Sequence, residues 1–184
     1  ARAFLGAGDR IKRGEAESLP LEDCSQNVII LESVLEHVES PEKALAEAYR
    51  ALRPGGVLFV DTTNKYRFSP VGRNGEYRVR FFNWFPRIVQ ESYVHQHLHF
   101  DPSLANYTPR PAVHWFSYSE LCRLGRSAGF YRFFSKLDLF ENQDPAVQQS
   151  WLRRLVFEQA RCRPWLRSLV LIQYGNSIFM AKRP

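Results

Sequence analysis

The sequence contains only three cysteines, Cys24, Cys122 and Cys162, and they are far apart along its 184 residues. This spacing excludes a C-x-x-C metal or redox motif and is typical of a reduced intracellular protein, so we expect a cytoplasmic location. No apolar run approaches the roughly 18–20 residues that cross a bilayer. The composition, 45% hydrophobic and 24% charged, indicates a globular protein with a real core, and the length predicts a single domain.

Acidic residues are scarce in the second part of the chain. Residues 1–60 carry 7 basic and 10 acidic side chains, whereas residues 61–184 carry 18 basic and 9 acidic ones. A basic region of this kind attracts nucleic acid, an anionic membrane or an anionic substrate, and the plain alternative is a solvated basic surface. Because the chain has no RNA-recognition aromatic motif and no basic repeat, we expect no nucleic-acid partner.

The first part of the chain alternates short apolar runs with one helical pattern, as parallel α/β units do. Residues 27–31 are mostly apolar and β-branched, which predicts a strand buried on both faces. Ser40-Pro41 is a helix start signal, and the following helix is expected to stop at Pro54-Gly55-Gly56. A second buried strand is expected at 57–60.

Residues 64–116 look like an insertion. Eleven aromatic residues fall between Tyr77 and Tyr118, so the segment is too aromatic for disorder, and we expect short helices that act as a lid. After it, the pattern predicts a helix from Ser119 to Gly129, a strand at 130–139, one or two helices at 145–167 broken near Pro164, and a strand or strand pair at 169–181.

Several motifs follow one another in a set order. Glu15-Ala16 comes before a Leu19-Pro20 turn, the predicted strand at 27–31 comes next, and Leu35-Glu36-His37-Val38 follows it. The predicted helix then ends in the run Arg50-Ala51-Leu52-Arg53-Pro54-Gly55-Gly56. This succession resembles the central part of the class I S-adenosylmethionine-dependent methyltransferases.

The resemblance covers residues 9–63 and 114–138, where Ala128-Gly129-Phe130 is similar to the family's entry into its sixth strand. It implies an α/β, Rossmann-like fold with a central, mostly parallel sheet and helices on both faces. It also implies S-adenosylmethionine as cofactor and methyl transfer to an O, N or C atom of a small molecule. The alternative is a non-catalytic binding or scaffolding module that keeps the fold.

The family's glycine-rich turn after its first strand has no match. Gly6-Ala7-Gly8 lies too close to Glu15 to leave room for the intervening elements, and we interpret it as the turn before a strand around 9–13. We therefore expect a domain truncated at its N-terminus, without its first two strands. Such a chain alone is expected to bind the cofactor poorly.

The resemblance also suggests which residues hold the cofactor. Glu15 would accept a hydrogen bond from the adenine amino group while the backbone beside Ala16 reads a ring nitrogen. Leu31 and Glu32, at the carboxyl end of the first predicted strand, would lie near the methionine part of the cofactor. The structural alternatives are a charged turn residue at Glu15 and a carboxylate bound to backbone at Glu32.

Two histidine patterns raise the question of a metal. Some methyltransferases carry Glu-x-x-Glu-His, but Ser33 stands at the first acidic position here and Glu32 is one residue away, which breaks the ligand set. His37 is then a candidate general base, with local packing as the alternative. On a strand, His95, His97 and His99 would share one face, with a turn or a helix as the alternative for this segment. Because no fourth ligand is evident, we expect no metal.

Aromatic and basic residues suggest two further surfaces. Trp84, Tyr93 and Trp115, all near or within the insertion, are candidates for substrate binding. Residues 151–167 form a basic amphipathic stretch of the kind that lies on anionic membranes, although such a helix more often buries its apolar side in the domain core. A membrane partner is therefore not favoured by the sequence.

Overall fold

A mixed four-stranded sheet organises the chain. The computed structural model describes residues 11–67, 79, 81–97, 112–139, 150–174 and 176–184. The strand order is β1-β2-β4-β3, from β1 (Gln26–Glu32) through β2 (Leu52–Asp61) and β4 (Ile178–Ala181) to β3 (Arg132–Ser135). β1 and β2 are parallel, while β4 is antiparallel to both of its neighbours. Three of the four strands thus run in one direction, and the chain has the predicted α/β architecture.

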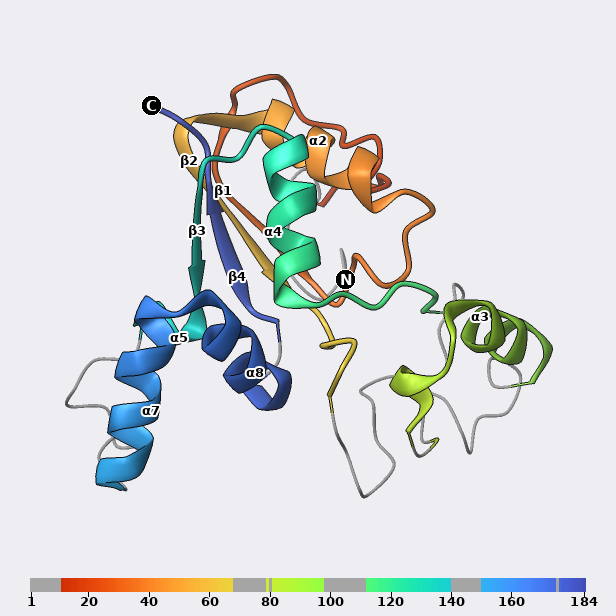
Figure 1. Ribbon diagram of the computed structural model, residues 1–184. Helices are drawn as coiled ribbons and strands as arrows, with labels where there is room; N and C mark the ends of the chain where they lie inside the picture. Colours follow the sequence, from red (N-terminus) through yellow and green to blue (C-terminus); the bar gives the residue numbers. More distant parts are fainter. Residues whose placement is uncertain (1–10, 68–78, 80, 98–111, 140–149, 175) are drawn as a thin grey trace.

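Helices α2 (Pro41–Ala51) and α4 (Tyr118–Ser127) lie side by side on one face of the sheet (Figure 1). The Ser40 side chain caps α2, as predicted, by accepting a hydrogen bond from the Lys43 amide. α4 is capped by Ser117, two residues before the predicted start, in a capping box with Glu120. Gly129 follows α4 with φ +108°, which confirms it as the helix stop.

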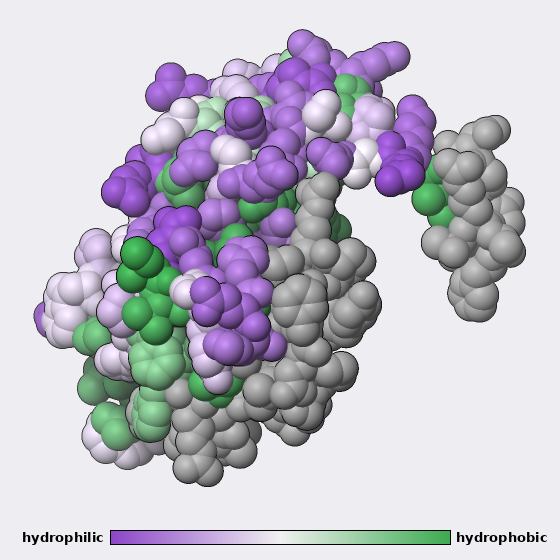
Figure 2. Space-filling model, turned by 90° about the vertical axis from the view of Figure 1, so that its right-hand side faces the viewer, coloured by the Kyte–Doolittle hydropathy of each residue, from purple (hydrophilic) through white to green (hydrophobic). Residues whose placement is uncertain are grey.

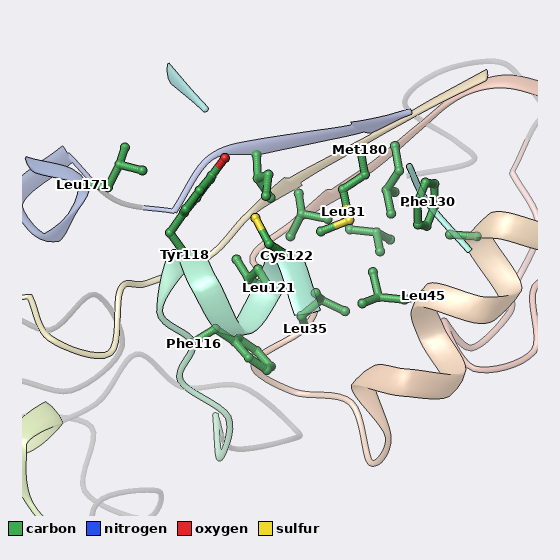
Figure 3. Packing of buried hydrophobic residues seen from close by; sticks show 14 of the residues in the cluster. Leu31, Leu35, Leu45, Phe116, Tyr118, Leu121, Cys122, Phe130, Leu171 and Met180 are labelled. Carbon is green, nitrogen blue, oxygen red and sulfur yellow. The ribbon is translucent and has the colours of Figure 1, made fainter. Parts of the chain in front are cut away.

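The core lies between these two helices and the sheet. Figure 3 shows Leu121 and Cys122 of α4 beside Leu45 of α2, with Leu31 and Met180 of the sheet across from them. Leu35, Leu45, Leu121 and Met180 are fully buried. Burial of these side chains holds α2 and α4 against β1 and β2, and it positions the loops that leave the carboxyl ends of the strands.

The opposite face of the sheet is exposed, which corrects one expectation. The strand at 27–31 is present, but Val28 is 57% exposed and Ile30 63% exposed, while Ile29 and Leu31 alternate with them and pack on the core. In the part of the chain that the structure describes, no helix covers these two residues. The continuous apolar run therefore does not mean burial on both faces in this structure.

The remaining elements differ from the sequence expectations in three places. β2 begins directly after α2 at Leu52, so residues 52–56 belong to the strand. The predicted strand at 130–139 is shorter, because the short helix α5 (Lys136–Leu139) follows β3. Residues 11–14 form no strand, and the rest of the segment expected at 9–13 lies outside the described residues.

The C-terminal part contains α7 (Trp151–Cys162) and α8 (Pro164–Tyr174), which confirms the predicted break near Pro164. The prediction of a strand from residue 169 is wrong for residues 169–174, which belong to α8. They are helical because Leu166, Val170 and Leu171 share a helix face that packs on the core. In Figure 1, α7 and α8 lie at one end of the sheet, away from α2.

Within the predicted insertion the structure describes the 3-10 helix η1 (Phe82–Trp84) and α3 (Arg87–Gln96). They pack around a small second core of Phe82, Val94, Ala112 and Trp115. Figure 2 faces the side on which α3 lies and shows hydrophobic side chains at the surface among charged ones. Among the described residues, no helix is long and apolar enough to span a membrane.

Candidate functional site

A cavity of about 470 Å³ lies at the carboxyl end of β1, where open α/β sheets place their ligands. We call it the strand-end cavity. Two segments line it. The first comprises residues 13–17 and the second contributes Ser33, Val34, His37 and Val38. Three predicted site residues, Glu15, Ala16 and His37, therefore come together around one space, although 22 positions separate Glu15 from His37.

The first wall of the cavity is a tight turn. The Ser18 amide donates a hydrogen bond to the Glu15 carbonyl at 3.1 Å, which closes the turn over Ala16 and Glu17. Gly14, just before this turn, packs closely against Pro20. A Cβ at position 14 would lie 2.4 Å from the Pro20 Cδ. Only glycine allows this approach. The Glu15 side chain stays exposed at the mouth of the cavity.

Glu17 ties this turn to the second wall. Its Oε1 accepts hydrogen bonds from the Glu39 amide at 2.7 Å and from the Ser40 amide at 3.4 Å, at the start of α2. A carboxylate in this place also complements the positive end of the helix dipole. The two walls are therefore held at a defined separation by one side chain.

Arg50 anchors the segment that follows the turn. Its guanidinium donates to the backbone carbonyls of Leu19 and Leu21 and pairs with Glu47 and Asp23. The hydrogen bond from Arg50 lowers the pKa of the Glu47 carboxyl, and these two carboxylates in turn raise the pKa of Arg50. Glu47 also accepts from the Leu19 amide at 3.0 Å. Helix α2 thus carries the turn that presents Glu15.

The second wall begins where β1 ends. Ser33 has a left-handed φ of 50° and donates its amide to the Asp61 carbonyl at 2.9 Å, so the chain turns away from the sheet there. In the following turn, the His37 amide donates a hydrogen bond to the Val34 carbonyl at 3.0 Å. This turn places the half-buried His37 side chain at the cavity. Sequence reasoning missed Ser33 as a cavity residue, because a left-handed serine leaves no signal in the pattern.

Leu31 and Glu32 stand just before this turn but do not line the strand-end cavity. Leu31 is 7% exposed and packs in the main core, whereas Glu32 is exposed at the strand end. Glu36, next to His37, points elsewhere: it is buried, and its Oε1 accepts from the Thr63 amide at 3.1 Å. Glu36 Oε2 and Thr62 Oγ1 are buried without a hydrogen-bond partner in the described structure. Glu36 therefore joins the ends of β1 and β2 and does not face the cavity.

A second cavity, of about 520 Å³, lies between the N-terminal ends of α2 and α4 and the start of α3. We call it the α2–α4 cavity. Trp115 lines it and packs edge-on against Phe82, with ring centroids 5.5 Å apart. Of the three predicted substrate residues, Trp115 lines this cavity and the other two do not. Trp84 is 57% exposed and Tyr93 is 38% exposed, and neither contributes to its lining.

Charged side chains surround the α2–α4 cavity. Lys65 pairs with Glu120 at 3.1 Å. Burial opposes ionisation of Glu120, but hydrogen bonds from Ser117 and Lys65 outweigh it and lower the pKa of this carboxyl. Burial, together with the charge of Arg87, lowers the pKa of His114. Arg87 Nη2 lies 3.4 Å from His114 Nδ1, and since arginine can only donate, this contact favours the neutral ring.

The histidines at 95 and 97 lie in and at the end of a helix, the alternative to a strand. His95 lies in α3, His97 caps its C-terminal end beside the Tyr93 ring, and His99 is outside the described residues. Within the described ranges, no three His, Cys, Asp or Glu side chains are arranged to hold a metal ion.

Comparison with known proteins identifies the first part of the chain. Residues 2–60 match the family described as Methyltransferase domain. Over these residues the chain is similar to S-adenosylmethionine-dependent methyltransferases. The matched stretch contains every described residue that lines the strand-end cavity. The methyltransferase resemblance inferred from the motif order is thereby confirmed, with S-adenosylmethionine as the cofactor of the family.

Individual methyltransferase relatives match only part of the chain. It is 42% identical over 60 residues to a probable S-adenosylmethionine-dependent methyltransferase of Mycolicibacterium smegmatis, covering 33% of this chain and 23% of that protein. It is 36% identical over 80 residues to the ubiquinone/menaquinone biosynthesis C-methyltransferase UbiE of a Ruegeria species, covering 42% of this chain and 30% of that protein. The chain thus spans less than a third of the length of these two relatives.

A solved structure of an S-adenosylmethionine-dependent methyltransferase from Methanosarcina mazei is 19% identical, with a TM-score of 0.47, and the alignment covers 94% of this chain and 66% of that one. A possible histamine N-methyltransferase from Thermotoga maritima is 29% identical, with a TM-score of 0.43, and covers 66% of this chain and 45% of that one.

Proposed function

We propose that the protein to which this chain belongs transfers a methyl group from S-adenosylmethionine to a small molecule, and that the strand-end cavity holds the adenosyl part of the cofactor. The observation that carries this proposal is the convergence of Glu15, Ala16 and His37 on one cavity. These residues belong to the stretch that matches the methyltransferase family. A cavity at a strand end is also the usual ligand position of such sheets.

The turn at 15–18 suits the purine. The Glu15 carboxylate accepts a hydrogen bond from the adenine amino group, and the backbone beside Ala16 lies next to the ring. Because Gly14, Pro20 and Arg50 support this turn, its polar groups are held in place before the ligand arrives, which reduces the cost of ordering on binding. Of the two residues before Ser33, the exposed Glu32 would lie on the side of the methionine part, whereas Leu31 is packed in the main core.

S-adenosylmethionine supplies a methyl group already activated on a sulfonium sulfur. The work left to the protein is to place the acceptor in line with that methyl group and to exclude water. His37 lines the cavity and can accept the proton that the acceptor loses. The acceptor is a small molecule, and the similarity to UbiE, a C-methyltransferase, favours carbon as the acceptor atom. Trp115, which lines the α2–α4 cavity, would contact it, whereas Trp84 and Tyr93 do not line that cavity.

The strand-end cavity has two walls, each formed by one short segment, and no third segment among the described residues lines it. We therefore propose that this chain alone binds the cofactor weakly. The same observation favours the second candidate function, a non-catalytic module that keeps the fold. The two candidates differ in whether the cofactor contacts Glu15.

Binding of S-adenosylhomocysteine tests this proposal. We measure it by ligand-observed NMR, because this method detects the weak binding that we expect. Glu15→Ala removes the carboxylate at the cavity, and Glu22→Ala removes an equally exposed carboxylate seven residues further along. We expect Glu15→Ala to weaken binding about tenfold, the effect of losing a hydrogen bond to a charged group, and Glu22→Ala to leave it unchanged.

Equal binding by wild type and Glu15→Ala would contradict the site, and undetectable binding at millimolar ligand would favour the non-catalytic module. A micromolar dissociation constant would contradict the expected weakness of the isolated chain while supporting the site.

A further inference from the structure

Helices α7 and α8 carry apolar side chains that are exposed in the described part of the structure. Trp151 is 78% exposed and Trp165 is 60% exposed. Leu155 and Leu169 follow Trp151 and Trp165 by four residues and so share a helix face with them, and Leu152 lies next to Trp151 and three residues before Leu155. The leucines concerned are Leu152 (53% exposed), Leu155 (46%) and Leu169 (54%). We call these five residues the α7–α8 apolar surface.

The exposure of this surface does not reflect loose attachment of the helices. The opposite sides of α7 and α8 are packed in the main core through Phe157, Ala160 and Leu171. Arg161 also donates to the Leu137 carbonyl at 2.8 Å, which ties α7 to α5. Both helices are therefore fixed by one face while the other presents tryptophan and leucine to solvent. The expectation that the apolar side would lie in the core is correct for only part of these helices.

Positive charge surrounds the apolar surface. Between residues 150 and 174 the chain has five arginines and a single acidic residue, Glu158, which pairs with Arg154 at 3.1 Å. Arg153, Arg154 and Arg163 are exposed beside the tryptophans. Apolar side chains flanked by arginine, with almost no acid, complement an anionic surface that has an apolar interior.

The basic character continues into a cavity of about 590 Å³ between α4, β3 and the turn from α7 to α8. Its lining includes four arginines and no acidic residue: Arg126, Arg132, Arg161 and Arg167. Arg167 is balanced by Asp138 at 2.9 Å, which leaves an excess of guanidinium groups. Cys162 and Pro164 also line this cavity, so it borders the turn that carries Trp165. Guanidinium forks in such a place suit the phosphate of a lipid headgroup.

The exposed apolar patch on α3 lacks this charge pattern. On α3, Ile88 is 77% exposed and Val89 46% exposed, but the neighbouring Arg87 is neutralised by Glu91 at 2.6 Å. Exposed apolar side chains without excess positive charge do not select an anionic surface. The α3 patch therefore serves as a matched control for the α7–α8 surface.

We propose that α7 and α8 dock the protein on an anionic lipid membrane. The two helices lie in the plane of the interface, the α7–α8 apolar surface enters the boundary between headgroups and acyl chains, and the arginines bind lipid phosphates. Tryptophan prefers this depth because its ring is apolar and its N–H finds polar partners there.

Co-sedimentation of the full chain with lipid vesicles tests the proposal. We expect the protein to sediment with vesicles of phosphatidylcholine that contain phosphatidylserine, to bind pure phosphatidylcholine much less, and to be released by high salt. Arg153→Gln with Arg154→Gln should lower the affinity about fivefold for each charge removed. Trp151→Ser and Trp165→Ser should each lower it about tenfold.

Ile88→Ser, an equally exposed substitution on α3, should leave vesicle binding unchanged. Because all these side chains are exposed, the variants are expected to fold, and circular dichroism checks this. Tryptophan fluorescence gives an independent readout: anionic vesicles should shift the emission of wild type to the blue. The shift should vanish in Trp151→Phe with Trp165→Phe, which keeps Trp84 and Trp115.

Three results would overturn the proposal. The first is equal binding to neutral and anionic vesicles, or no binding to either. The second is loss of binding in Ile88→Ser but not in the tryptophan variants, which would assign the surface to α3. The third is a dimer in solution that dissociates in Trp165→Ser, which would show that a second copy of the chain covers the α7–α8 apolar surface.

Discussion

The contact between Gly14 and Pro20 gives the sharpest test of how the strand-end cavity is built. A Cβ at position 14 would lie 2.4 Å from Pro20 Cδ and 2.9 Å from Cγ, whereas ordinary contact begins at 3.4 Å. Gly14→Ala must therefore displace the turn, or Pro20, by about 1 Å. Since the φ of Gly14 lies outside the left-handed region, alanine fits the backbone, and the effect is purely steric.

Overpacking of this size costs about 1–3 kcal/mol. The stiffer unfolded chain of the alanine variant offsets about 0.4–1 kcal/mol of it. We expect a net fall in the free energy of unfolding of about 1 kcal/mol or more, measured by urea denaturation. Because the displaced turn carries Glu15, cofactor binding should weaken as well, by up to about a hundredfold for a 1 Å misplacement.

A double-mutant cycle isolates the clash from these background effects. Pro20→Ala removes Cγ and Cδ, after which the nearest remaining atom is the backbone nitrogen at 3.7 Å. The double variant Gly14→Ala/Pro20→Ala should therefore recover the loss, with a coupling energy of about 1–3 kcal/mol. A coupling energy below about 0.5 kcal/mol would refute the reasoning, since independent sites add within that margin.

Two further predictions concern His114 and Leu121. Burial and Arg87 lower the pKa of His114 below its usual 6.5, so the unfolded chain takes up a proton first as the pH falls. Stability should therefore decline as the pH falls below about 6.5, until the pKa of His114 in the folded protein is reached. In a profile of melting temperature against pH, His114→Gln should flatten this part of the curve. An unchanged slope would contradict the assignment. Leu121 is fully buried between α4 and the sheet, so Leu121→Ala should cost about 2–5 kcal/mol in urea denaturation, whereas Ile88→Ala should cost less than about 0.5 kcal/mol; similar losses would contradict the core described above.

Local signals in the sequence predicted the first half of the fold well. Ser40-Pro41 starts α2, and the apolar run at 27–31 forms β1, because capping and strand preference act within a few residues. The C-terminal part was harder. Residues 169–174 are rich in β-branched and other apolar residues, and only their packing as part of α8 shows that the helical period applies.

The candidate site was predicted in part. Motif order singled out Glu15, Ala16 and His37 separately, and only the structure shows that all three line the strand-end cavity. The roles of Gly14 and Ser33 depend on a close approach and on a left-handed φ, and neither is visible without coordinates. The sequence also could not predict which side chains of α7 are exposed. Trp151 and Phe157 lie on the same helix, and only the structure shows that Trp151 faces solvent and Phe157 is buried.

The position of β4 has a consequence for how the protein is made. Among the described strands it comes after the other three in the sequence, yet it lies between β2 and β3 and is the hydrogen-bonded neighbour of both. During synthesis the ribosome must release residues 178–181 before β3 can join the sheet at all. Until then β2 presents an open edge on the side that β4 will occupy, and a chaperone or a short β-forming peptide can occupy the gap that the final strand closes.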